Sequence, residues 1–264
     1  MCGRFVVASV GSELVGVLRV DLESDDLPAP SYNVAPTAPV AIVLDSAKTE
    51  PPTRRLETAR WGLVPAWAKD PSIGSRAFNA RSEELEDKPM FRKALEKRRA
   101  VVPASGYYEW KQVDGGKIPH YIHPADDSPL FMAGLYEWWK DPAKPDDDPD
   151  RWLLSFTILT RDSIGRLGSI HDRMPLFLDP DHADAWLDPT TDNVRDVLDA
   201  AIDAAPALAD TLDDHVVSKA VGNVRNNSPE LIHRPPRRPP PERARHRRRE
   251  TRRTPRCGNP CLRS

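Results

Sequence analysis

An arginine- and proline-rich C-terminal segment, residues 234–264, confines the folded part of the chain to what precedes it. This tail holds 12 arginines, 2 glutamates and 7 prolines, and apolar periodicity stops where it begins. Such a composition buries too little apolar surface to offset the entropy of ordering, so we predict a disordered tail. Residues 1–233 are predicted to form a single domain. The tail is either a solvated basic extension or an arm that contacts nucleic acid non-specifically.

The two parts of the chain carry opposite charge. The tail takes 12 of the 38 basic and 2 of the 40 acidic residues, which leaves 26 basic and 38 acidic residues in positions 1–233. The body is therefore near −12 and the tail near +10, although the whole chain carries only −2. A contact between the body and DNA would have to depend on a local basic groove, because net charge is screened beyond about 10 Å.

The cysteines and the hydropathy pattern bear on the compartment. Cys2, Cys257 and Cys261 are too few for a disulfide framework, which favours a reducing, cytoplasmic location, at the nucleoid in a bacterium. Cys257 and Cys261 form a C-x3-C pair without a second pair of ligands, so we expect no zinc site. No apolar run approaches the ~18 residues of a membrane span, and no basic-then-apolar leader opens the chain.

The order of predicted elements favours an α+β fold with a curved, mostly antiparallel sheet and peripheral helices, because no regular βαβ repeat is visible. The stretch 141–150, with three prolines and five aspartates, is predicted to be a loop. Helices are predicted over residues 12–19, 89–98, 181–187 and 192–203, and strands over residues 39–44, 58–64, 99–103, 106–112, 118–122, 130–136 and 153–160.

Cys2 is the first candidate for chemistry. The small residue after Met1 is typical of chains from which the initiator methionine is removed, and Cys2 would then carry both an α-amine and a thiol. Their reference pKa values are about 7.7–8.0 and about 8.5, so a fraction of each is nucleophilic at neutral pH. A 1,2-aminothiol reacts with an aldehyde to give an imine, and the thiol then closes a thiazolidine ring. An incidental cysteine at this position is the alternative.

Four further segments place polar residues in patterns that suit a site. They are YNVAP (32–36), FNARSE (78–83), GYYEWK (106–111) and IHDRMP (170–175). Each also has a purely structural explanation. The two asparagines could bond turn backbones, the glutamate could be a surface strand residue, and the histidine could be structural. The phosphate-binding and hydrolase motifs GxxxxGK[ST], GxGxxG, HExxH and GxSxG do not occur in the sequence.

Seven segments in matching order resemble the SOS response-associated peptidase (SRAP) family, whose members cross-link to abasic sites in DNA. The resemblance runs from Met1 to about Ile232, and the tail from His233 lies outside it. It implies a compact α+β fold with a barrel-like core, single-stranded DNA binding and covalent capture of abasic sites. The segments are MCGRF, YNVAP, WGLVPAWA (61–68), FNAR, GYYEW, IHDRMP and KAVGNVRNNSPELI (219–232).

The resemblance also implies roles for single residues. Cys2 matches the nucleophile, and Asn79, Glu109 and His171 match residues that line the active site. Asn33 matches a further polar residue there, Arg81 and Arg4 match phosphate contacts, and Trp67 matches a residue near the point where paired DNA is split. The implied partner is single-stranded DNA with abasic sites, at replication-associated junctions, bound by a monomer.

The chemistry of these side chains agrees with that implication. Glu109 lies among aromatic residues, whose packing would raise its pKa and suit it to proton transfer. His171 can protonate the sugar ring oxygen as the ring opens, and Asn79 and Asn33 can orient groups without changing charge. Imine formation also makes the 2′ proton acidic, so β-elimination of the 3′ phosphate is an expected side reaction. No metal or organic cofactor is needed.

The contact with DNA is expected to combine charge and stacking. A groove of basic residues could hold a few phosphates, and tryptophans such as Trp67 could stack unpaired bases. The predicted groove consists of Arg4, Arg76, Arg81, Arg98 and Arg99.

Two other functions remain open on sequence grounds. An N-terminal-nucleophile cysteine peptidase would also use a free Cys2 thiol, with the α-amine serving only as a base. A non-covalent nucleic-acid-binding module would depend on the tail and would not need Cys2.

Overall fold

The computed structural model describes residues 2–8 and 16–236. Residues 237–264 lie outside the described part, and so does nearly all of the segment predicted to be disordered, together with Cys257 and Cys261. Of the helix predicted over residues 12–19, positions 16–18 are helical and positions 12–15 lie outside the description.

Five strands close into a barrel, which confirms the predicted α+β fold with a barrel-like sheet. Antiparallel pairing runs in the order β5–β4–β7–β10–β11. A parallel pairing of β11 with β5, in which Phe156 faces Trp61, completes the ring. The strands are β4 (Pro39–Ser46), β5 (Thr53–Trp61), β7 (Arg99–Ala104), β10 (Leu130–Lys140) and β11 (Trp152–Asp162).

Short strands extend the barrel at its edges. β2 (Leu22–Glu23) pairs with β5, while β6 (Asn79–Arg81) and β12 (Arg173–Pro175) pair with β11. β13 (Phe177–Leu178) pairs with β10. Two of these strands carry residues from the motifs of the sequence, so the barrel edge brings those motifs together.

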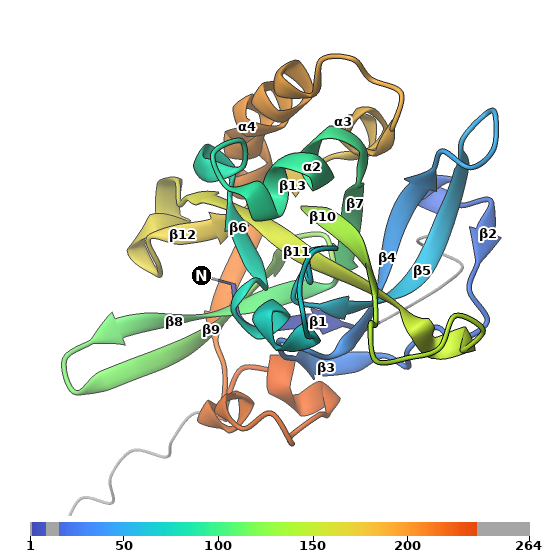
Figure 1. Cartoon of the computed structure of the whole chain (residues 1–264). Helices are drawn as coiled ribbons and strands as arrows, with labels where there is room; N and C mark the ends of the chain where they lie inside the picture. The colour runs from blue at the N-terminus through green and yellow to red at the C-terminus, as the bar shows by residue number, and fades with distance from the viewer. Residues whose placement is uncertain (1, 9–15, 237–264) are drawn as a thin grey trace, which may run out of the picture.

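A second, antiparallel sheet carries the N-terminus, in the order β14–β9–β8–β1–β3. Its long β8–β9 hairpin projects from the body (Figure 1). Its strands are β1 (Phe5–Val7), β3 (Ser31–Val34), β8 (Gly106–Val113), β9 (Gly116–Pro124) and β14 (Leu212–Val216).

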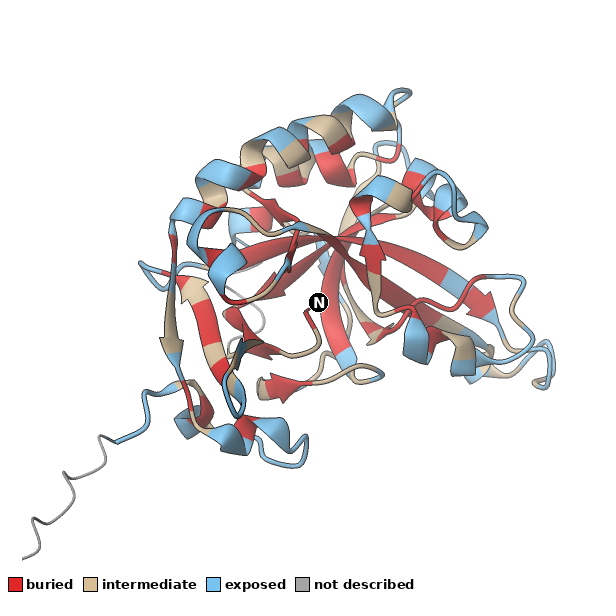
Figure 2. Cartoon of the chain, turned by 90° about the vertical axis from the view of Figure 1, so that its left-hand side faces the viewer, coloured by how far each residue is buried: buried red, intermediate tan, exposed pale blue. Residues whose placement is uncertain are grey.

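Helices cover the barrel from one side, with buried inner faces and exposed outer faces (Figure 2). The three predicted in the described region are present, but α4 continues past residue 203 because the buried Ala205 and Ala209 extend its apolar face. They are α2 (Pro89–Lys97), α3 (Pro180–Leu187) and α4 (Val194–Asp210). Short 3-10 helices are η1 (Pro71–Arg76), η2 (Ser82–Glu84), η3 (Pro149–Arg151), η4 (Gly165–Ser169), η5 (Lys219–Gly222) and η6 (Pro229–Ile232).

The strand predicted over residues 58–64 is wrong in its bounds. β5 begins at Thr53, because the guanidinium of Arg54 is held by Asp45 and Asp184 and the segment pairs along the whole of β4. It ends at Trp61 because Gly62 adopts a φ of 127°. A Cβ at position 62 would overlap the backbone of Gly74, so the turn requires glycine.

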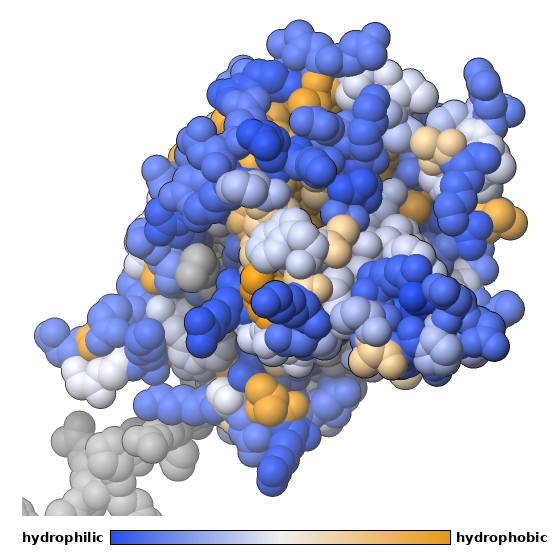
Figure 3. Space-filling view, viewed as in Figure 1, coloured by the Kyte–Doolittle hydropathy of each residue, from blue (hydrophilic) through white to orange (hydrophobic). Residues whose placement is uncertain are grey.

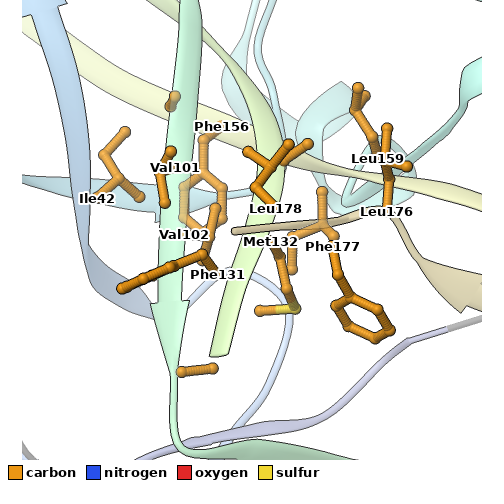
Figure 4. Close-up of a cluster of buried hydrophobic side chains, with 14 of the residues drawn as sticks. Ile42, Val101, Val102, Phe131, Met132, Phe156, Leu159, Leu176, Phe177 and Leu178 are labelled. Carbon is orange, nitrogen blue, oxygen red and sulfur yellow. The ribbon is translucent and has the colours of Figure 1, made fainter. Parts of the chain in front are cut away.

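The core fills the barrel and the space beneath the helices. Branched and aromatic side chains from neighbouring strands interlock there, among them Ile42, Val101 and Phe156 (Figure 4). β7 is buried along its whole length, which explains its continuous apolar run. The outer surface viewed in Figure 3 is mostly hydrophilic, with small separate hydrophobic patches. Within the described ranges, no helix is both long and apolar enough to cross a membrane.

Candidate active site

Cys2 lies at the centre of the site, separated from the start of β1 by Gly3 and Arg4. Its side chain is completely buried, and its backbone carbonyl accepts a hydrogen bond of 2.6 Å from Nδ2 of Asn79. Its Sγ lies 3.9 Å from the carbonyl oxygen of Arg4. Phe5 pairs with Tyr107 on one side and with Val34 on the other, so the strand after Cys2 is held between β8 and β3. The N-terminal segment is therefore fixed in position.

The buried thiol is electrostatically unsuited to ionise. Burial raises the pKa of Cys2 well above its ordinary value, and the negative charge of Glu109 raises it further. Reactive thiolates occur in electropositive, partly exposed surroundings. Cys2 is instead buried beside a carboxyl group, and both features favour the protonated thiol, although the N-terminal amine acts in the opposite direction.

Glu109 stands on β8, close enough to Cys2 for their charges to interact. Its side chain is only 3% exposed. Burial raises its pKa, as predicted from the aromatic context, while His171 acts in the opposite direction. A carboxyl group with a raised pKa can be protonated near neutral pH and is suited to give and take protons.

Glu109 and His171 both line an open cleft of about 460 Å³. His171 enters it from the turn that follows η4. In its neutral form, Nδ1 accepts a hydrogen bond of 3.0 Å from the backbone N–H of Arg173. The same nitrogen lies 2.8 Å from Oδ1 of Asp172, to which it donates when the ring is protonated. The cleft is lined by Gly3, Arg4, Glu109, Trp110, Lys117, His171 and Gly222.

A second cleft, of about 470 Å³, contains Asn79 and Trp67. Trp67 is 63% exposed, and Nε1 of Trp139 fixes its loop by donating a hydrogen bond of 2.8 Å to the carbonyl of Ala68. Because Asn79 also bonds the Cys2 carbonyl, it links the second cleft to Cys2, whose neighbour Gly3 lines the first cleft. The lining consists of Trp67, Ile73, Arg76, Ala77, Asn79, Lys88, Pro89, Met90 and Phe91.

Asn79 and Arg81 are two residues apart on β6 and therefore face the same side of the strand, as their spacing predicts. β6 pairs in parallel with β11, where Asn79 lies opposite Ile158 and Arg81 opposite Thr160. The Arg81 guanidinium is about half exposed and lies 3.2 Å from the carboxylate of Glu84. The Arg81 guanidinium is therefore accessible from solvent, close to Asn79 and the buried Cys2.

Asn33 and Arg4 hold the wall of the first cleft. The guanidinium of Arg4 donates to Oδ1 of Asn33 at 2.9 Å and to the carbonyl of Val221 at 2.8 Å. Asn33 is buried, and its Nδ2 donates to the carbonyls of Asn223 and Asn226 at 3.1 and 2.8 Å. Arg4 lines the cleft, whereas Asn33 lies behind it. Gly222 of η5 lines the cleft, and the segment after η5, which sequence reasoning left without a role, holds Asn33 behind it.

The structure contradicts part of the predicted basic groove. Arg99 is 2% exposed, and its guanidinium donates to backbone carbonyls at the ends of α2 and α3, including those of Leu95 and Trp186. Its guanidinium bonds carbonyl groups that the C-terminal turns of the helices leave unpaired, so it cannot reach a phosphate. Arg98 is bound to Glu137 at 2.8 Å. Arg4 and Arg76 line the two clefts, and Arg81 lies beside them.

Two cleft residues were missed as site residues by sequence reasoning. Lys117 belongs to β9 and reaches the cleft only because the hairpin places it opposite Gln112. Trp110 was identified only as a neighbour that desolvates Glu109, but it lines the cleft itself. The GYYEWK segment contained the signal for Trp110, whereas no local pattern marks Lys117.

The sequence and the fold of this chain have counterparts among known proteins. A family model described as SOS response associated peptidase (SRAP) matches residues 1–224. The chain is 38% identical to the abasic site processing protein YoqW of Bacillus subtilis (strain 168), over 88% of this chain and 99% of that protein. It is 33% identical to the abasic site processing protein YedK of Escherichia coli (strain K12), with the same coverage.

Solved structures show the same fold. A crystal structure of a protein from Bacteroides thetaiotaomicron aligns with a TM-score of 0.67 at 23% identity, over 88% of this chain and 99% of that one. From the match over residues 1–224 and these relatives, the chain belongs to the SOS response-associated peptidase family.

Proposed function

We propose that this protein captures abasic sites in single-stranded DNA as a covalent adduct on Cys2, after removal of Met1. Relatives of similar length that are named abasic site processing proteins support this proposal. The proposed partner is DNA at replication-associated junctions, bound by a monomer in the cytoplasm. The residues of the site supply acid–base groups for the reaction, which needs neither a metal nor an organic cofactor.

The observation that carries the proposal is the environment of Cys2. Its carbonyl is fixed by Asn79, and its thiol is buried beside Glu109 with a raised pKa. A thiol that resists ionisation is a poor first nucleophile, whereas a free α-amine has a reference pKa only slightly above neutrality. The amine therefore attacks first and the thiol second.

The first step joins the amine to the ring-opened sugar. The Cys2 nitrogen attacks the C1′ aldehyde, and the resulting carbinolamine loses its hydroxyl as water. Glu109, whose pKa is raised by burial, donates in its protonated form the proton that this water needs. The nitrogen loses its own proton, and the C=N bond of the imine forms.

The second step closes the ring. The sulfur adds to the imine carbon, the π electrons move to nitrogen, and the thiol proton is transferred to that nitrogen through the Glu109 carboxylate. His171, which lines the same cleft, donates a proton to the sugar ring oxygen as the abasic ring opens. If the imine loses its 2′ proton before the thiol adds, the 3′ phosphate leaves by β-elimination.

The second cleft is suited to hold the strand. The exposed indole of Trp67 can stack an unpaired base, which contributes about 1–3 kcal/mol. Arg76 and Lys88 line this cleft, and Arg81 lies beside it, so a few phosphates can be neutralised locally despite the negative charge of the body. Because the cross-link is covalent, stable capture of the strand does not require a strong electrostatic attraction.

A cysteine peptidase is the competing function for the same residue. A peptidase of this kind activates the thiol and uses the amine only as a base. Burial and the neighbouring Glu109 raise the pKa of the Cys2 thiol and outweigh the N-terminal amine, which disfavours that mechanism.

The test is direct. Purified protein is incubated with a single-stranded oligonucleotide that carries one abasic site, and the products are separated on a denaturing gel. We expect a slower band with the abasic oligonucleotide, no such band with the intact oligonucleotide, and no stable band with Cys2→Ala. The absence of an adduct with the wild-type protein would refute the proposal, whatever the affinity for DNA.

A further inference from the structure

Glu109 has a second histidine beside it, across the β8–β9 hairpin. In the antiparallel register Glu109 lies directly opposite His120. Directly opposite residues of an antiparallel pair share one face of the sheet, with Cβ atoms about 4.5–5.5 Å apart. His120 is not among the residues that carry the family resemblance, and the proposed mechanism gives it no role.

A carboxylate fixes this histidine in place. Nδ1 of His120 lies 2.8 Å from Oδ2 of Asp214 on the neighbouring strand β14. The two side chains are 13% and 21% exposed, so solvent screens their charges only partly. The pair is neutral overall when His120 is protonated, and negative when it is not.

Asp214 also reaches the segment that carries His171. Its Oδ1 lies 3.6 Å from the guanidinium of Arg166 in η4, the 3-10 helix that precedes His171. Arg166 is bound at 3.0 Å by Asp213 as well, and that carboxylate is 60% exposed. Asp214 thus contacts both the neighbour of Glu109 and the approach to His171, whereas Asp213 contacts only the latter.

We propose that the His120–Asp214 pair is a positioning pair that sets the pH range in which Glu109 exchanges protons. The inference rests on the proposed function, since it assigns Glu109 the acid–base role in cross-linking. The charged and titratable groups near the pair are Glu109 and Tyr107 on β8 and Arg166 on η4, while the N-terminal amine and His171 act on Glu109 itself.

The sign of the effect follows from the charges. A protonated His120 compensates Asp214 and favours the carboxylate of Glu109. If His120 is replaced by a neutral residue, the longer contact of 3.6 Å with Arg166 is the remaining cationic contact of Asp214, whose negative charge near Glu109 is then less compensated. That charge favours the protonated form of Glu109, so the carboxyl group would hold its proton to higher pH.

Three variants separate this role from a merely structural one. His120→Gln removes the compensating charge and retains a hydrogen-bonding side chain. The double variant His120→Gln/Asp214→Asn also removes the carboxylate of Asp214. Asp213→Asn is the matched control, because it weakens the hold on Arg166 and leaves the contact between Asp214 and His120 intact.

The experiment measures single-turnover cross-linking to an abasic oligonucleotide at saturating DNA between pH 5 and 9. The rate requires a protonated Glu109 together with an unprotonated Cys2 amine, so the lower midpoint of the bell-shaped profile equals the lower of the two pKa values and the upper midpoint equals the higher. We assign the lower, acidic midpoint to Glu109 and use the alkaline midpoint, from the Cys2 amine, as the internal reference. We expect His120→Gln to move the acidic midpoint upward by about half a unit to one unit. The double variant should return it toward the wild-type value, and Asp213→Asn should leave it unchanged.

Two results would overturn the inference while leaving the proposed function intact. One is a His120→Gln profile that coincides with the wild-type profile. The other is a shift that the double variant does not reverse, since a packing defect would persist there. A wild-type protein that forms no adduct at any pH would instead refute the proposed function itself.

Discussion

The two clefts beside Cys2 are nearly equal in volume, about 460 and 470 Å³, yet they differ in chemistry. The first is lined by ionisable side chains, including Arg4, Glu109 and His171. The second is lined mainly by apolar and aromatic side chains, including Trp67 and Phe91. In the proposed function, bond formation is confined to the first cleft and the seating of the strand to the second. Changes in the two clefts should therefore separate rate from affinity.

The difference arises from how each cleft is built. The first is formed by paired strands, where β1 and β8 fix the buried N-terminus against a buried carboxylate. The second is formed by the irregular segment around Trp67 and by the start of α2, which present side chains to solvent. Rigidly paired strands suit groups that must be positioned for a reaction. An exposed indole suits binding that does not depend on DNA sequence, because it can stack on any base.

The largest effect should come from blocking the amine of Cys2, which adjoins the first cleft through Gly3. If Met1 is retained, or a tag precedes Cys2, the nitrogen of Cys2 is an amide whose lone pair is delocalised into the carbonyl. It cannot form an imine, so we expect complete loss of the denaturation-resistant adduct although the thiol is intact. Mass spectrometry of the N-terminus and a denaturing gel of the same preparation test this.

Cys2→Ala with Met1 removed is the complementary variant. It keeps the amine and lacks the sulfur, so we expect a transient imine that borohydride traps, together with strand cleavage, but no thiazolidine. The peptidase alternative predicts instead that the thiol alone carries the activity. A stable adduct formed by the uncut tagged protein would contradict our assignment of Cys2.

The next largest effect should come from Glu109→Gln, which keeps the shape of the side chain and removes proton transfer. Acid–base assistance contributes roughly 10²–10⁴-fold, so cross-linking should slow by a factor in that range. DNA affinity, measured before the covalent step by fluorescence anisotropy at low temperature, should be retained. Wild-type rates at every pH between 5 and 8 would remove Glu109 from the mechanism.

Much of the site could be predicted from local sequence. The FNAR spacing correctly placed Asn79 and Arg81 on one face of a strand, and the aromatic context of Glu109 correctly gave the direction of its pKa. Both properties depend on neighbours along the chain. The closed barrel, by contrast, was expected from the family resemblance, because its parallel β5–β11 pairing leaves no local pattern.

What could not be predicted depends on contacts between distant segments. The sequence around Arg99 indicates a basic surface residue. In the structure, the C-terminal carbonyls of α2 and α3 surround its guanidinium. Likewise, Arg4 meets Val221 across almost the whole described chain, and His120 meets Asp214 only through the order of strands in the second sheet. No periodicity marks such pairs, since neither partner is unusual in its own segment.

A smaller effect is expected in the second cleft. Trp67→Ala removes a stacking surface of about 1–3 kcal/mol, which corresponds to roughly 5- to 150-fold weaker binding of single-stranded DNA. At saturating DNA the cross-linking rate should be unchanged, because Trp67 does not line the first cleft. Trp152→Ala is the matched control, since that indole is 53% exposed and lines neither cleft. Equal losses in both variants would argue against a specific role for Trp67.

The smallest effect concerns the arginine-rich tail, residues 234–264. Each phosphate neutralised on a single strand adds about 0.7 to the slope of log K against log salt. If the 12 arginines of residues 234–264 engage a few phosphates, a chain ending at His233 should bind with a flatter salt dependence. Its cross-linking yield at saturating DNA should match that of the full chain, because every proposed catalytic residue precedes position 172. An unchanged slope would make the tail a solvated extension, whereas lost cross-linking at saturation would place it in the active site.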